Sequence, residues 1–323
     1  MKKLAAFCFP VLTSGLLALA LTGCNQDPKT GAAAETSTSG SIKISADESF
    51  QPIIGAQLDV FHKLYKNATV KAAYKTEQEV VNDLLEDSAR LAIIARPLSD
   101  SELETLSRNS KISKQGIKTT KIAYDGIALI LHPDNKDTLL SVPQLKDIFT
   151  GKVKSWKALN PKSDLGDITI VFDNNNSSSA RFMQDSITNG QPFPANTYAS
   201  KSMPAVVDYV TQNKNARGVI GNNWISDFDD STVVGFINRV KVVAVSREHT
   251  PENPDNYVQP YQAYLAQGTY PLRREIYIIS REARAGLGTG FVSFAAGDKG
   301  QRIVLKGGLV PARGVVRLVE VKR

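Results

Sequence analysis

The chain has 323 residues, of which 42% are hydrophobic and 22% are charged, so it can bury a large core and is not a disordered protein. Two cysteines and three histidines exclude a disulfide scaffold and a cysteine-rich or histidine-rich metal site, and we expect no metal and no cofactor. The formal charge of +7 comes from scattered lysines and arginines without interleaved aromatics, which argues against nucleic-acid binding. The length favours two domains.

The first 40 residues predict export. Lys2 and Lys3 precede an uncharged, apolar stretch that runs to Cys24, as in a secretory signal peptide. The stretch ends in Leu-Thr-Gly-Cys, which resembles the lipobox of bacterial lipoproteins, and this resemblance implies cleavage before Cys24 and its lipidation. A plain secretory signal or an anchor helix is the alternative. We therefore expect a signal peptide over residues 1–23 and a flexible tether over 24–40, on a protein lipid-anchored to a bacterial membrane, in the periplasm or at the cell surface.

Beyond this segment, strands and helices alternate. Helices are predicted over residues 50–65 and 77–87 and from the capping boxes at Ser99 and Ser141. Strands are predicted over residues 42–44, 69–74, 91–95, 121–132, 168–172, 218–221, 242–245 and 276–279. This alternation indicates an α/β fold with mostly parallel sheets.

Polar residues gather where two predicted strands lead into helices. Asp47 and Ser49 follow the first strand, with Ser49 as the expected N-cap and Pro52 in the first turn. The second of these strands ends at Phe172 and is followed by Asp173 and three asparagines. The predicted helix then begins with the serine-rich segment Ser177, Ser178, Ser179, Ala180, Arg181. Helix N-termini attract anions, and serine and arginine add donors. On spacing alone, however, an ordinary helix cap explains such segments better than an anion site does.

Several segments, in order from about Ser41 to Ala312, resemble the phosphate-binding subunits of ABC-type uptake systems in the type II periplasmic-binding-protein superfamily. The segments are residues 121–130, 145–156, 176–181, 216–221, 270–274, 300–301 and 308–311. The resemblance implies two lobes, each a mostly parallel sheet flanked by helices, with the ligand in the cleft between them. The first lobe would combine residues 41–128 with 270–323, and the second would span 129–269.

Carried over position by position, the resemblance implies that Ser49, Ser177, Ser178 and Ser179 bind phosphate. Arg96 stands where well-studied members have the aspartate that accepts the phosphate proton. The charged ligands expected here are therefore Arg96 and Arg181.

A carboxylate acceptor favours phosphate, which keeps a proton at neutral pH, over sulfate. We hypothesise that Asp173 or Asp47 supplies it. The alternatives are that Arg96 is a surface residue, that Arg181 pairs with Asp185, and that Asp173 closes an Asx turn.

Three functions follow from this pattern. The first is a monomeric receptor that binds inorganic phosphate without chemistry and passes it to the permease subunits of an ABC transporter. The second is the same kind of receptor for another oxyanion or an organic phosphate. The third is a secreted phosphatase with a nucleophile among Ser177–Ser179, although the sequence offers no nucleophile elbow and no recognisable activating base. We expect the first, which is not an enzyme.

Overall fold

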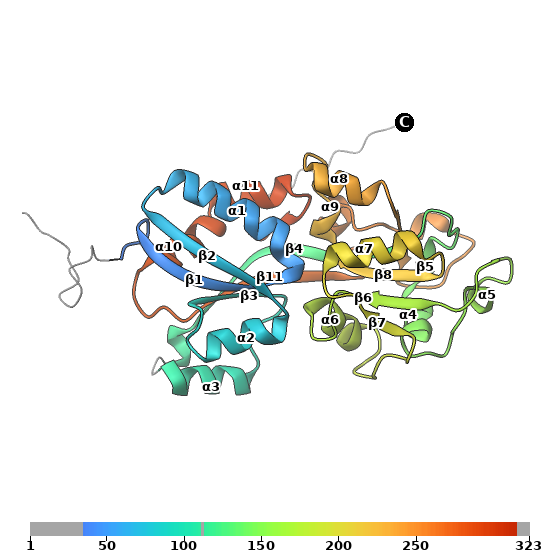
Figure 1. Cartoon of the computed structure of the whole chain (residues 1–323), viewed down its shortest axis with the longest axis horizontal. Helices are drawn as coiled ribbons and strands as arrows, with labels where there is room; N and C mark the ends of the chain where they lie inside the picture. The colour runs from blue at the N-terminus through green and yellow to red at the C-terminus, as the bar shows by residue number, and fades with distance from the viewer. Residues whose placement is uncertain (1–34, 111–112, 315–323) are drawn as a thin grey trace, which may run out of the picture. The chain divides into compact units, whose positions relative to one another are not determined.

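The computed structural model describes residues 35–110 and 113–314 (Figure 1). The predicted signal peptide, Cys24 and most of the predicted tether lie outside these described residues. Within the described ranges, none of the helices combines the length and the apolarity that crossing a bilayer requires.

Strands and helices alternate along the chain, and the predicted α/β class is confirmed. The helices are α1 (Gln51–Leu64), α2 (Glu77–Leu85), α3 (Asp100–Ser110), α4 (Val142–Phe149), α5 (Trp156–Leu159), α6 (Ser178–Ser186), α7 (Met203–Gln212), α8 (Ser231–Ile237), α9 (Gln262–Gln267), α10 (Leu287–Ala295) and α11 (Asp298–Lys306). Short 3-10 turns are η1 (Glu48–Phe50), η2 (Lys114–Gly116), η3 (Asn222–Trp224) and η4 (Pro254–Asn256). The strands are β1 (Gly40–Asp47), β2 (Ala68–Lys75), β3 (Leu91–Ile94), β4 (Lys118–Leu131), β5 (Leu139–Ser141), β6 (Thr169–Phe172), β7 (Thr197–Ala199), β8 (Ala216–Gly221), β9 (Lys241–Val242), β10 (Ala244–Ser246), β11 (Arg273–Ser280) and β12 (Val310–Pro311).

One sheet runs through the molecule in the order β2-β1-β3-β11-β4-β8-β6-β7. Its two ends are parallel, since β1 pairs in parallel with β2 and β3, and β6 does so with β7 and β8. The centre is antiparallel: β11 pairs with β3 and β4, and β4 pairs with β8 through residues 127–131. The chain passes from the first lobe to the second along β4 and returns at β11, and these two antiparallel strands are the crossing segments (Figure 1).

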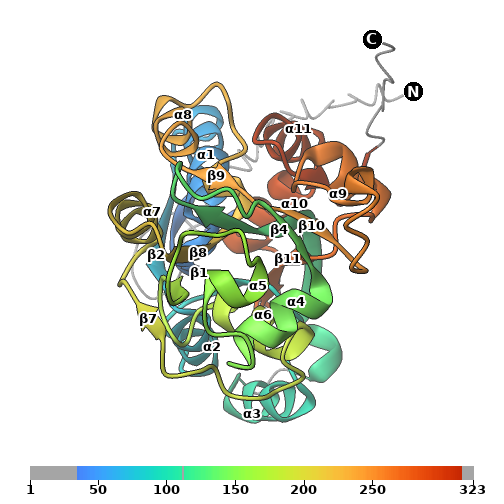
Figure 2. The same ribbon diagram turned by 90° about the vertical axis from the view of Figure 1, so that its right-hand side faces the viewer.

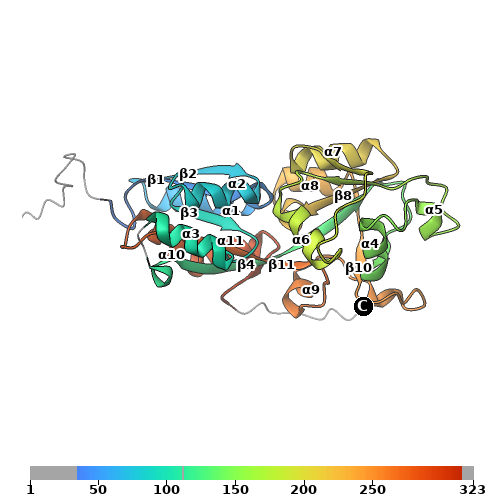
Figure 3. The same ribbon diagram turned by 90° about the horizontal axis from the view of Figure 1, so that it is seen from below.

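Each lobe has helices on both faces of its part of the sheet. In the first lobe, α1, α10 and α11 lie on one face and α2 and α3 on the other (Figure 2). The ring of Phe61 is central there, 5.4 Å from Phe291 and 5.3 Å from Phe294 between ring centroids. In the second lobe, α7 covers one face and α4 and α6 cover the other (Figure 3).

Along β4, Ala123 packs in the first core, whereas Ile127 and Leu129 pack in the second. Tyr270 and Leu272, which we expected to open the return to the first lobe, still pack in the second core. The reason is that β11 begins only at Arg273. The lobe boundaries themselves stay predictions.

Candidate anion-binding site

The first polar junction lies at the end of β1. Its cap is Asp47 rather than the predicted Ser49: the Oδ1 atom of Asp47 accepts a hydrogen bond from the Ser49 backbone N–H at 2.9 Å. Ser49 lies inside the short turn η1, and α1 begins two residues later with Pro52 in its first turn. The Ser49 hydroxyl, free of the capping role, also donates to Asp47 Oδ1.

The second polar junction lies between β6 and α6. Ser177 is the N-cap of α6, and its Oγ accepts from the backbone N–H of Ala180 at 3.2 Å. Ser178 and Ser179 occupy the first turn of the helix and are fully buried. The Ser177 hydroxyl is thus used locally, whereas the next two serines face the first lobe.

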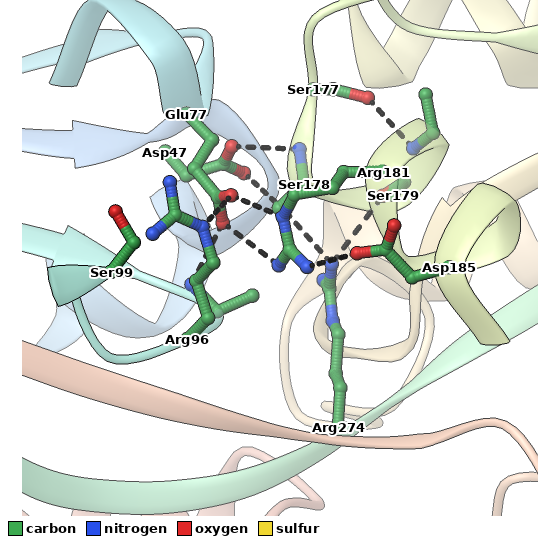
Figure 4. Close-up of polar contacts among 12 residues, drawn as sticks. Asp47, Glu77, Arg96, Ser99, Ser177, Ser178, Ser179, Arg181, Asp185 and Arg274 are labelled. Carbon is green, nitrogen blue, oxygen red and sulfur yellow. Dashed lines mark hydrogen bonds and ion pairs between the residues drawn. The ribbon is translucent and has the colours of Figure 1, made fainter. Parts of the chain in front are cut away.

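The two junctions meet, although they are 129 positions apart in the sequence: the hydroxyl oxygens of Ser49 and Ser178 are 3.1 Å apart. Ser178 also donates from its backbone N–H to Asp47 Oδ2 at 3.2 Å and from its hydroxyl to Oδ1 at 3.0 Å (Figure 4). Asp47, Ser49 and Ser178 are all fully buried. The structure therefore brings the first loop and the serine segment to one point between the lobes.

Arg274 on β11 completes this cluster, although it was not among the site residues predicted from the sequence. Its guanidinium donates to Asp125 Oδ2 from Nε at 2.9 Å, and Nη2 lies 2.8 Å from the same oxygen. Nη1 donates to Ser178 Oγ at 3.0 Å and reaches Ser179 Oγ at 3.5 Å, while Nη2 donates to Ser49 Oγ at 3.1 Å. One buried cation thus contacts hydroxyls from both junctions.

A sequence signal for Arg274 exists but is weak. Arg273 and Arg274 stand side by side on β11, and alternation along a strand sends their side chains to opposite faces. The pairing of β11 with β4 sets Arg274 directly opposite Asp125. Only that register decides which of the two arginines is buried with a carboxylate.

The two arginines predicted as ligands are paired with carboxylates beside the serine cluster (Figure 4). Arg96 donates to Glu77 at 3.2 Å and, from two nitrogens, to Glu102 at 2.7 and 2.8 Å. Arg181 donates to Glu77 and also to Asp185 at 3.0 Å, so the pair with Asp185 named as the alternative is present. The physical reason is the burial of Glu77, because a carboxylate removed from water needs cationic partners. These residues form an ionic bridge from α2 in the first lobe to α6 in the second (Figure 4).

Carboxylates dominate the electrostatics around the serines. Burial raises the pKa of Asp173 to about 7, and the charge of Asp47 adds to this effect, while hydrogen bonds from Ser177 and the Asn174 backbone oppose it. Burial, with the charge of Glu77, also raises the pKa of Asp47. Oδ1 of Asp173 is buried and has no hydrogen-bond partner in the part of the chain that the structure describes. The site thus offers donors for an oxyanion together with acceptors for a proton.

Contacts from the end of β8 and from η3 hold the lobes together at this point. Asn223 Nδ2 and Trp224 Nε1 both donate to the backbone carbonyl of Ser49, at 2.7 and 3.0 Å. Gly221 lies so close that a Cβ there would be 2.8 Å from Arg274 Nη2 and 3.2 Å from the Ser49 oxygen. The absence of a side chain at Gly221 permits this approach.

Two α/β lobes joined by a pair of crossing strands, with helix starts from both lobes meeting between them, define the periplasmic-binding-protein class. The family model described as the PBP superfamily domain matches residues 31–299, and the chain belongs to this superfamily. The resemblance drawn from the sequence is thereby confirmed.

The chain is also similar to individual proteins that are named as phosphate-binding proteins. The chain is 26% identical over 268 residues to the phosphate-binding protein PstS of Staphylococcus saprophyticus, covering 81% of this chain and 77% of that protein. Among solved structures, it resembles a candidate phosphate ABC transporter substrate-binding protein with bound phosphate from Clostridium perfringens (TM-score 0.69, 23% identity, 85% of this chain and 100% of the other). It also resembles an ABC-type phosphate transport receptor from Vibrio cholerae (TM-score 0.62, 19% identity, 83% and 99%).

Proposed function

We propose that this protein is an extracytoplasmic receptor that captures inorganic phosphate between its lobes and delivers it to the permease subunits of an ABC transporter. The phosphate-binding PstS relatives support the ligand, and the likeness to the phosphate transport receptor of Vibrio cholerae supports the transport role. The observation that carries the proposal is the meeting of two junctions from opposite lobes, at which the Ser49 and Ser178 hydroxyls share the guanidinium of Arg274.

In this proposal, the hydroxyls of Ser49, Ser178 and Ser179 and the first N–H groups of α6 bind the phosphate oxygens, because a helix N-terminus favours an anion. Arg274 adds a planar, permanently charged donor. Asp173 accepts the phosphate proton through its unpartnered Oδ1, which selects phosphate over the fully ionised sulfate. Ser177 contributes by capping α6 rather than by touching the ligand.

Export and anchoring belong to the same proposal. The charged start and the apolar stretch up to Cys24 support a signal peptide, and the residues before Cys24 support lipidation of that cysteine. A lipid-held receptor on a tether stays near the permease that it serves. Mass spectrometry of the exported protein tests this, and an N-terminus other than an acylated Cys24 would contradict it.

Calorimetric titration of the anion-stripped protein with phosphate, sulfate and molybdate tests the ligand. We expect saturable phosphate binding that exceeds sulfate binding, because Asp173 repels an oxyanion without a proton. The absence of phosphate binding would refute the proposal. We also expect no turnover of a chromogenic phosphate ester with or without divalent metals, and turnover would favour the phosphatase alternative.

Gly221→Ala is expected to weaken phosphate binding by about 10-fold or more. The added methyl group would meet Arg274 and the Ser49 carbonyl and hold the lobes apart, and such overpacking typically costs about 1–3 kcal/mol. Gly235→Ala in α8 is the matched control, since a Cβ there meets nothing within 4 Å. Equal phosphate affinity in both variants, measured by calorimetry, would show that the close approach at Gly221 does not support binding.

A further inference from the structure

Asp47 engages the same donors that would hold an oxyanion. Its Oδ1 accepts from the Ser49 N–H at 2.9 Å, from the Ser49 hydroxyl and from the Ser178 hydroxyl at 3.0 Å. Its Oδ2 accepts from the Ser178 N–H at 3.2 Å, at the N-terminus of α6. Two of these four bonds come from the first lobe and two from the second.

Capping of η1 alone does not require this arrangement. The bond from the Ser49 N–H to Oδ1 is the local cap, two residues along the chain. The bonds from Ser178 reach across 131 positions and end on a carboxylate with no exposed surface. A carboxylate buried between lobes at a helix N-terminus has the chemistry of a bound anion, because N–H groups and hydroxyls compensate for its removal from water.

A tethered ligand competes strongly with a free one. Asp47 is fixed at the end of β1, so its local concentration at these donors far exceeds that of any dissolved anion, by the arithmetic of intramolecular binding. Phosphate would need the same donors, which are the Ser49 and Ser178 hydroxyls and the first N–H groups of α6. The free anion and the Asp47 carboxylate therefore exclude each other at these donors.

We propose that Asp47 is a built-in competitor of the ligand: its carboxylate occupies the oxyanion position between the lobes, and phosphate binds only by replacing it there. This inference rests on the proposed function for the identity of the anion. It assigns to Asp47 the control of affinity, and it adds Asp47, through Ser178, to the contacts that join the lobes.

The test compares the full exported protein with its Asp47→Ser variant, in which serine still caps the turn. The matched control is Asp230→Ser, because Asp230 caps α8 through the N–H groups of Thr232 and Val233, outside the serine cluster. By calorimetry with inorganic phosphate, we expect Asp47→Ser to bind at least 10-fold more tightly than the unchanged protein, and Asp230→Ser to bind as the unchanged protein does.

A second readout does not depend on phosphate. In anion-free buffer, we expect the unchanged protein to keep its lobes together and Asp47→Ser to separate them, which raises the radius of gyration in X-ray scattering. Fluorescence reports the same change, because Trp224 donates to the Ser49 carbonyl across the lobes and is mostly buried. Trp156 lies inside the second core and serves as the constant background.

The outcomes separate the two proposals. If phosphate binds, the phosphate affinities of the unchanged protein and of Asp47→Ser are compared. Equal affinities overturn the proposal that Asp47 competes with phosphate, while the proposed receptor function stands. If neither protein binds phosphate, the proposed function fails, and the radius of gyration tests the role of Asp47. Equal radii overturn the proposal that Asp47 occupies the anion position, and a larger radius in Asp47→Ser supports it. Should Asp47→Ser not fold, Asp47→Asn, which keeps the volume and removes the charge, is judged by the same two measurements.

Discussion

Replacing Arg274 with methionine is expected to abolish phosphate binding and to lower the free energy of unfolding by about 3–5 kcal/mol. Arg274 and Asp125 form an ion pair in which neither side chain is exposed by more than 1%. Loss of the guanidinium leaves the Asp125 carboxylate buried without its cation, and it also removes the donors to Ser49 and Ser178. Urea unfolding measures the first effect and calorimetry the second.

The double variant Arg274→Met with Asp125→Asn separates these effects. We expect it to regain most of the lost stability, since no uncompensated charge remains, but not the binding, since the cation is still absent. Arg302→Met is the control for stability, because its pair with Asp298 is largely exposed and is worth at most about 1 kcal/mol. Phosphate affinity that survives in Arg274→Met would remove this residue from the site.

Asp173→Asn is expected to flatten the pH dependence of stability. Burial raises the pKa of Asp173 to about 7 in the folded protein, against an ordinary value of 3.8. The folded state therefore holds this proton more tightly, and the stability that it contributes below pH 4 is lost as the pH rises towards 7. Between pH 5 and pH 8, the unchanged protein should lose about 2–3 kcal/mol more than Asp173→Asn.

Urea unfolding of both proteins at the two pH values measures this difference, in which the contributions of groups that do not interact with Asp173 cancel. Asp298→Asn is the control, because its carboxylate is exposed and should leave the pH profile unchanged. Identical losses in Asp173→Asn and the unchanged protein would show that Asp173 is ionised in the folded state at pH 5. The same variant should also narrow the preference for phosphate over sulfate, since the proton acceptor is then gone.

The local signals of the sequence predicted helices α1 to α4 and strands β1 to β4, among other elements of this fold. The capping box at Ser141 is present with both of its hydrogen bonds, and Gly151, just after α4, adopts the left-handed conformation (φ 75°) that favours glycine at the end of a helix. The alternation of strands and helices predicted the α/β class. Such signals act within a few residues, so the sequence suffices to find them.

The cap of the first polar junction was predicted less well. Both Asp47 and Ser49 are good caps, and the choice between them depends on Ser178, which belongs to the other lobe. Competition between two adequate local caps is thus decided by a distant partner.

The sequence by itself determined the α/β class, the superfamily and the positions of the two polar helix starts. It could do so because the hydrophobic period, the helix caps and the motifs depend on residues close together in the chain. Only the tertiary structure decided the partners of the charges. The register of β11 on β4 brought Arg274 to Asp125, and the buried Glu77 took Arg96 and Arg181. Buried charges pair with whatever the fold brings near them, and that proximity depends on contacts between residues far apart in the chain.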